Sequence, residues 1–130
     1  MSSDVRFLDS SVVIRHFREG GSVSKRLESF AGLYLSSVAL GELYSGANRS
    51  ARPAENLAQI AAFITGVTII VVDAETAKHY GQISAQLAAQ GTPIPQNDLW
   101  IAACARQWGL TLATTDPHYT RIAGLSYEMW

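Results

Sequence analysis

The chain has 130 residues and a mass of 14.1 kDa, which is the size of one domain with a single hydrophobic core. Hydrophobic residues make up 48% of it and charged residues 16%, which excludes a disordered chain. The formal net charge is −1, yet the first 52 residues hold seven of the ten Lys/Arg. This distribution is compatible with a solvated face or with a surface that faces phosphates.

Two further features indicate where the protein works. The N-terminus lacks a basic segment followed by an apolar one, so no secretory signal is visible, and the longest apolar stretch, 60–72, is too short to span a bilayer. The single cysteine, Cys104, excludes an internal disulfide and fits a reducing compartment. We therefore expect a cytoplasmic protein with no membrane segment and with one domain covering 1–130.

Strands and helices alternate in the first half of the chain. We expect strands at 5–8 and 33–35, and helices up to residue 17, at 22–30, at 38–47 and at 54–64. Ser10 or Ser11 is predicted to cap the first helix and Ser36 or Ser37 the third, because a serine oxygen accepts an unpaired amide proton of a first helical turn.

The second half of the chain continues the alternation. We expect strands at 67–72, 110–114 and 126–129. Asp73 is predicted to cap a long helix that ends at Gly91, and Asn97 a helix that ends at Gly109. The helix that ends at Gly109 is apolar on every face, which is typical of a helix with neighbours on more than one side.

This order of elements predicts an α/β fold in which a parallel sheet is covered on both faces, giving three layers, α/β/α. Ligands of such sheets bind beyond the carboxyl ends of the strands. Asp9 and Asp116 directly follow predicted strands, Glu42 lies in the helix entered from the second strand, and Asp98 lies in the first turn of a later helix. We expect these four acids to meet at one edge of the sheet.

Each acid alone has an ordinary interpretation as a cap, a turn residue or a solvated side chain. Together they require a cation, because two unit charges ~4 Å apart repel by about 4 kcal/mol at an effective dielectric near 20. Carboxylates without a His or Cys pair nearby select Mg²⁺ or Mn²⁺ over Zn²⁺. Such an ion with open positions suits the hydrolysis of phosphodiester bonds.

Four segments also carry a family resemblance. They are LDSS at 8–11, SSVALGELYSG at 36–46, PIPQNDLWIAA at 93–103 and LATTD at 112–116. In order and spacing they resemble the motifs of PIN-domain nucleases and, within that family, of the VapC-type toxins of bacterial toxin–antitoxin pairs. The resemblance covers nearly the whole chain. It implies a PIN-like three-layer fold and a Mg²⁺- or Mn²⁺-dependent endoribonuclease that acts on RNA, with Asp9, Glu42, Asp98 and Asp116 as catalytic metal ligands.

The resemblance implies supporting groups and partners as well. Ser10 and either Thr114 or Thr115 would supply hydroxyls behind the metal ligands. Ser11 stands where many members have Asn, which puts one supporting hydrogen bond in doubt. The partners implied are a second copy of the chain, in a homodimer, and a cognate VapB-type antitoxin. The C-terminal segment of that antitoxin would lie in an apolar groove between the first helices and present a basic residue to the acids.

Two other functions remain open. A metal-dependent phosphatase of the haloacid-dehalogenase type needs a second Asp two positions after the first, and here that position is Ser11. A non-catalytic PIN-fold module that binds RNA or protein would keep the fold, although the presence of all four acids argues against it. His118 follows Asp116 and could touch substrate or take part in proton transfer, but a lone His beside a turn is more often a surface residue, which is the interpretation we adopt. Trp100 and Trp108 are interpreted as side chains that pack in the core or in a dimer.

Overall fold

A five-stranded sheet forms the middle layer of the structure, a computed structural model that describes residues 4–130. The strands are β1 (Val5–Leu8), β2 (Gly32–Ser36), β3 (Thr68–Ile70), β4 (Leu112–Thr114) and β5 (Tyr127–Met129). They lie in the order β3-β2-β1-β4-β5, and every neighbouring pair is parallel. The predicted parallel sheet is therefore confirmed.

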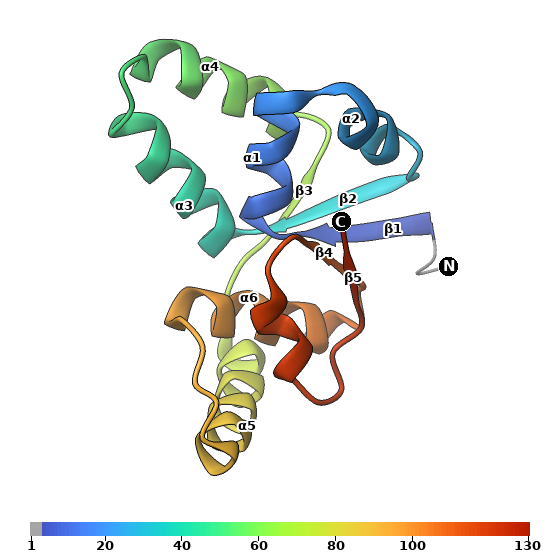
Figure 1. Ribbon diagram of the computed structural model, residues 1–130, viewed down its shortest axis with the longest axis vertical. Coiled ribbons are helices and arrows are strands. Elements are labelled where there is room, and N and C mark those ends of the chain that lie inside the picture. Colours follow the sequence, from blue (N-terminus) through green and yellow to red (C-terminus); the bar gives the residue numbers. More distant parts are fainter. Residues whose placement is uncertain (1–3) are drawn as a thin grey trace.

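Helices cover both faces of this sheet. They are α1 (Ser10–Glu19), α2 (Gly21–Glu28), α3 (Ser37–Asn48), α4 (Pro53–Ile64), α5 (Ala74–Gln90), α6 (Gln96–Trp108) and the 3₁₀ helix η2 (Pro117–Arg121). Figure 1 shows α1 to α4 on one side of the sheet and α5, α6 and η2 on the other. The three-layer α/β/α architecture follows, because right-handed crossovers that move in opposite directions along a sheet fall on opposite faces.

Helix α6 is buried, as its composition predicts. Leu99 and every residue from 101 to 105 are buried, and the helix packs against both α5 and α3. Gly109 ends it in the left-handed conformation, with φ 63°, and Gly91 ends α5 in the same way, with φ 68°. Both predicted glycine stops are confirmed.

The predicted caps divide into two groups. Ser36 caps α3 by accepting the amide proton of Ala39, at 2.9 Å, and Asp73 caps α5 within a capping box completed by Thr76. The prediction for Asn97 is wrong. Helix α6 begins two residues earlier than an Asn97 cap would place it, with Pro95 at the N-cap position, and the Asn97 side chain hydrogen-bonds to Glu42 instead.

The predicted cap of α1 is also wrong. Asp9 occupies the N-cap position without a capping side-chain hydrogen bond, and Ser10 and Ser11 lie inside the helix. Both serine hydroxyls donate hydrogen bonds to carboxylates, and Ser11 Oγ accepts the backbone N–H of Thr115, which lies outside the helix. Contacts with the acids and with the segment after β4 thus take the place of local capping.

The strand predicted at 67–72 is shorter than expected, since β3 ends at Ile70. β3 lies at the edge of the sheet and pairs only with β2, so little holds the chain in the sheet beyond Ile70. Val71 is 62% exposed there.

The two tryptophans of α6 lie in different surroundings. Trp108, at the end of the helix, is 56% exposed, so the prediction of core packing is wrong for this residue. Trp100 stacks on Tyr80, with ring centroids 4.0 Å apart. No helix within residues 4–130 is both long enough and apolar enough to cross a bilayer.

A two-pronged ion pair ties β5 to β1 across β4. Arg6 donates from Nε to Glu128 Oε1 at 2.8 Å and from Nη2 to Oε2 at 2.9 Å. The hydrogen bonds from Arg6, the largest cause, hold the pKa of Glu128 below its usual range. This arrangement is the fork-to-fork geometry in which an arginine–carboxylate pair is strongest.

We expect Glu128→Gln to lower the free energy of unfolding by about 1 to 2 kcal/mol at pH 7, because hydrogen bonds to a charged group are lost. The pKa of Glu128 is depressed in the folded state, so its contribution is present above the unfolded pKa of about 4.3 and is lost as the pH falls through the folded pKa. Urea unfolding at pH 7 and pH 3 measures this. A difference between variant and wild type that is undiminished at pH 3 would contradict it.

Candidate metal centre

The four predicted acids come from four elements whose ends lie near one edge of the sheet (Figure 1). Asp9 follows β1 and Asp116 lies two residues after β4; these strands are neighbours, with Leu8 paired to Ala113. Glu42 projects from α3, the helix that directly follows β2, and Asp98 from the first turn of α6. Their positions follow from parallel strands that share one carboxyl edge.

Asp9 is held by three hydroxyl groups. Its Oδ2 accepts hydrogen bonds from Ser11 Oγ at 2.7 Å and from Thr114 Oγ1 at 2.8 Å, and its Oδ1 accepts one from Tyr119 at 3.2 Å. The side chain is buried, with the residue only 4% exposed. The three hydroxyls thus fix the direction of the carboxylate, which forms no ion pair with any residue between 4 and 130.

Tyr119 is the deepest of these donors. It is fully buried, and burial together with the negative charge of Asp9 raises the pKa of its phenol above the usual range. The phenol therefore stays protonated and remains a donor to Asp9. Sequence reasoning missed this residue, since nothing in the local pattern marks a tyrosine one residue after His118 as a partner of Asp9.

We expect Tyr119→Phe to lower the free energy of unfolding by about 1 kcal/mol at pH 7, because Asp9 loses one of its three donors while the ring still fills the core. Urea unfolding of wild type, Tyr119→Phe, Asp9→Asn and the double variant measures the coupling between the two side chains. A loss of equal size in the Asp9→Asn background would show that the phenol acts through packing and not through Asp9.

The other acids affect the pKa values of Glu42 and Asp98. Burial is the largest cause that raises the pKa of each side chain. The charges of Asp9 and Asp98 raise the pKa of Glu42 further. The charges of Asp9 and Asp116 do the same for Asp98. Hydrogen bonds from Ser10, at 3.1 Å, and from Asn97 oppose the shift at Glu42. The charge of Asp9 thus disfavours ionisation of both Glu42 and Asp98, and the charge of Asp116 disfavours ionisation of Asp98.

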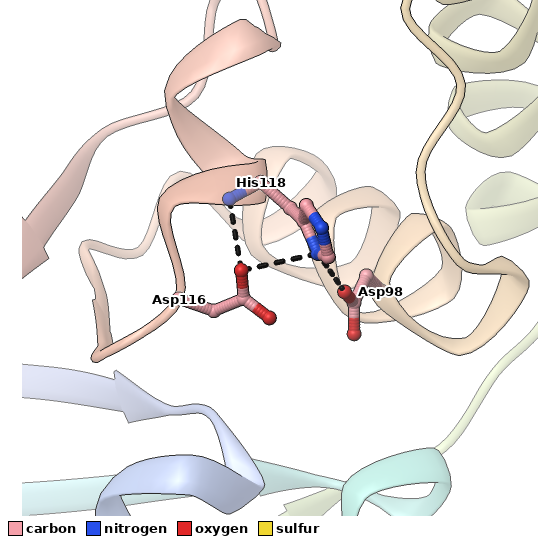
Figure 2. Close-up of side chains that lie close together, drawn as sticks. All are labelled: Asp98, Asp116 and His118. Carbon is pink, nitrogen blue, oxygen red and sulfur yellow. Dashed lines mark hydrogen bonds and ion pairs between the residues drawn. The ribbon is translucent and has the colours of Figure 1, made fainter.

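His118 joins two of the acids, as Figure 2 shows. Its Nδ1 lies 3.1 Å from Asp98 Oδ2 and 3.0 Å from Asp116 Oδ1, and its backbone N–H donates to Asp116 Oδ1 at 2.9 Å. The interpretation of His118 as a surface residue is wrong. The signal that could have identified it is the sequence Asp116-Pro117-His118, because proline begins the short helix η2 and Asp116 caps it.

The predicted supporting hydroxyls have different roles. Ser10 donates to Glu42, and Thr114 both donates to Asp9 and accepts the backbone N–H of Asp116, at 2.9 Å. Thr115 contributes its backbone N–H to Ser11 Oγ, at 3.1 Å, and across residues 4–130 its side chain makes no hydrogen bond to an acid. A supporting hydrogen bond was in doubt at Ser11, because many family members have Asn at this position. The Ser11 hydroxyl does donate a hydrogen bond to Asp9.

This set of donors fits a divalent metal ion. The carboxylates supply oxygens, which hard cations such as Mg²⁺ and Mn²⁺ prefer. In the part of the chain that the structure describes, Asp98 and Asp116 form ion pairs with His118 and with no lysine or arginine. Burial, followed by the charges of neighbouring acids, raises the pKa values of Glu42 and Asp98, and a bound cation would favour the ionised form of both.

Comparisons with known proteins agree with this geometry. The family model described as "PIN domain" matches residues 6–125. A protein of Shigella flexneri named "tRNA(fMet)-specific endonuclease VapC" is 38% identical over 126 residues, which cover 95% of this chain and 96% of the relative. VapBC2 from Rickettsia felis, solved bound to a DNA fragment from its promoter, superposes with a TM-score of 0.93 at 27% identity and covers 97% of this chain and 98% of the matched one. VapBC from Salmonella typhimurium, also solved bound to DNA, gives 0.87 at 32% identity over the same shares. The chain therefore belongs to the PIN-domain family and, within it, to the VapC proteins, as the four sequence motifs predicted.

Proposed function

We propose that the protein is a Mg²⁺- or Mn²⁺-dependent endoribonuclease that acts as the toxin of a toxin–antitoxin pair in the cytoplasm. One observation carries the proposal: the four acids come from elements that meet at the carboxyl edge of the sheet, where the charge of Asp9 acts on Glu42 and Asp98 and that of Asp116 acts on Asp98. The names of the relatives support it. That of Shigella flexneri is called an endonuclease, and one of Haemophilus influenzae, 36% identical over 95% of this chain, is called "Ribonuclease VapC2".

In this proposal Asp9, Glu42, Asp98 and Asp116 hold the ion. When bound, the ion supplies a Lewis acid for a phosphodiester oxygen and lowers the pKa of a water that can attack phosphorus.

The chain's own groups fix the direction of the carboxylates. Ser11, Thr114 and Tyr119 orient Asp9, whereas Ser10 and Asn97 orient Glu42. Ligands held in this way do not have to reorganise when substrate arrives.

The charge of the rest of the molecule favours RNA as the substrate. Without the four acids, the chain has seven Asp/Glu against ten Lys/Arg, a net charge of +3. A positive balance around a neutralised metal site attracts a phosphate backbone, and the attraction weakens as salt is added. Initiator tRNA is the first substrate to test, because the Shigella flexneri relative is named for it.

The proposed antitoxin has a suitable binding site in the groove between α1, α3 and α4. This groove has a volume of about 290 Å³ and is lined by apolar side chains that include Ile14, Phe17, Leu43 and Ile60. Glu42 also lines it, so a bound segment with apolar side chains and one cation could reach the acids. The matched structures from Rickettsia felis and Salmonella typhimurium are VapBC complexes.

A homodimer is also part of the proposal. Val71 and Trp108 leave 62% and 56% of their surface exposed, and both line a second hollow, of about 510 Å³, beside β3. Exposed apolar surface of this kind is typical of an interface between chains. Sedimentation at micromolar concentration tests it, and a nuclease-active monomer would exclude the dimer.

Growth after induction tests the toxin assignment. We expect the protein alone to arrest growth and the small protein encoded beside it to restore growth when both are expressed. Arrest that persists beside every adjacent small protein would overturn the toxin assignment. A phosphatase or a non-catalytic module would leave cellular RNA uncut.

A further inference from the structure

We propose that His118 is itself a ligand of the metal ion, so that the site combines nitrogen and oxygen donors and retains Mn²⁺ in preference to Mg²⁺. This inference rests on the proposed function, since it concerns the same site. It goes beyond that function because it assigns the ion a nitrogen ligand that the four acids do not supply.

The first argument is the spacing of the donor atoms (Figure 2). One atom from each of Asp98, Asp116 and His118 lies within 4.8 Å of the other two, and His118 Nδ1 is 3.1 Å and 3.0 Å from the two carboxylate oxygens. In an octahedral site with bonds of about 2.1 Å, adjacent ligand atoms lie about 3 Å apart. His118 Nδ1 thus lies at the separation of a neighbouring ligand from both carboxylates, and the two carboxylates lie within 4.8 Å of each other.

The second argument is that the backbone positions the imidazole ring. Pro117 begins η2, Asp116 caps it by accepting the His118 N–H, and the fully buried Tyr119 anchors the next residue. The His118 side chain is 35% exposed, so an ion can reach it from solvent. These contacts hold the ring at the edge of the acid cluster.

The alternative role for His118 is a hydrogen-bond donor that only bridges the two acids. An ionised carboxylate accepts hydrogen bonds, so in the protein without an ion Nδ1 carries a proton and donates it. As a ligand, Nδ1 must use its lone pair instead. Solvent then takes the Nδ1 proton and supplies one to Nε2, so the ring stays neutral and only its tautomer changes. The two roles therefore differ in whether a nitrogen is bonded to the ion.

A nitrogen ligand changes which ion the site prefers. Mg²⁺ is bound through carboxylates and waters, whereas transition-metal ions accept imidazole readily. We expect His118→Ala to weaken Mn²⁺ binding by about tenfold or more, and Mg²⁺ binding by much less. The ratio of Mn²⁺ affinity to Mg²⁺ affinity should therefore be smaller in His118→Ala than in wild type.

Pulsed electron paramagnetic resonance of bound Mn²⁺ tests the bond directly, because a coordinated imidazole gives a ¹⁴N modulation. Wild type should show the modulation, and His118→Ala should lose it while Mn²⁺ still binds. His79→Ala is the matched control, since His79 lies on α5 and bonds to Arg106 at 3.1 Å, outside the site. Mn²⁺ and Mg²⁺ affinities are measured on the same samples by calorimetry.

Bound Mn²⁺ without ¹⁴N modulation in wild type would overturn the proposal, whether or not the variant folds. A modulation that survives in His118→Ala would also overturn it. RNA cleavage by the same samples separates the two claims. If RNA is cleaved in Mg²⁺ but no ¹⁴N modulation is seen, His118 is not a metal ligand and the proposed nuclease function stands. If the modulation is seen but RNA is not cleaved, His118 is a ligand and the proposed nuclease function is wrong.

Discussion

Replacing Asp98 by Asn is expected to reduce RNA cleavage by about 100-fold or more while the fold stays intact. Asp98 lies among Asp9, Asp116 and His118, so its removal takes one charged ligand from the centre of the proposed site. Loss of even a group that only supports a metal ligand typically costs about 10- to 100-fold, so loss of the ligand itself should cost about 100-fold or more. Cleavage rates of purified wild type and variant in Mg²⁺ measure the effect.

Without a metal ion, Asp98→Asn should be more stable than wild type, although it is less active. The pKa of Asp98 is raised by burial, so its ionised form is disfavoured in the folded protein. The penalty is present above the folded pKa and vanishes as the pH falls below the unfolded pKa of about 3.9. Asp98→Asn should therefore melt at a higher temperature than wild type at pH 7, and added Mn²⁺ should raise the melting temperature of wild type more.

Glu75→Gln is the matched control for this variant. Glu75 is also an acid in the first turn of a helix, α5, but it is exposed and pairs with Lys78 at 2.9 Å. We expect Glu75→Gln to cleave RNA as wild type does, and its melting temperature to rise with Mn²⁺ as much as that of wild type. Activity of Asp98→Asn within a few-fold of wild type would remove Asp98 from the metal centre.

The second large effect is expected at the groove between α1, α3 and α4. Ile14 lines this groove and is 38% exposed, so Ile14→Glu should fold normally and place a charge where an apolar side chain would bind. Burial of an unpaired charge should weaken binding of the partner encoded beside the gene by about 100-fold, whereas cleavage of RNA should be unchanged. Binding is measured with purified partner, and growth with both genes expressed.

Tyr127→Glu is the control for the groove variant. Tyr127 is 37% exposed but lies on β5, away from the helices that form the groove. It should bind the partner as wild type does. If Ile14→Glu also binds and is neutralised as wild type is, the partner uses another surface.

The positions of the four acids were predictable because each depends on a local signal. Asp9 and Asp116 follow apolar strands, and Asp98 lies where proline begins a helix that glycine ends. Parallel strands then place such residues at one edge without further information. The parallel sheet and its three layers followed from the same alternation of elements, whereas the order of the strands was not predicted.

Tyr119 and Asn97, whose roles sequence reasoning missed, both depend on contacts between distant segments. Tyr119 reaches Asp9 across 110 positions, and Asn97 reaches Glu42 from another helix, so neither residue leaves a periodic signal. Asn97 was predicted to cap its helix because capping is the commonest use of asparagine there. The early end of β3 likewise reflects its place at the sheet edge, which no local pattern encodes.

The central claim is metal-dependent cleavage of RNA at the cluster of Asp9, Glu42, Asp98 and Asp116. The most direct measurement exposes total cellular RNA to the purified protein in Mg²⁺ or Mn²⁺ and maps the new ends by sequencing. We expect new internal ends with wild type and metal, and none with excess EDTA or with Asp98→Asn. Full cleavage in EDTA, or the same ends from Asp98→Asn, would contradict the account.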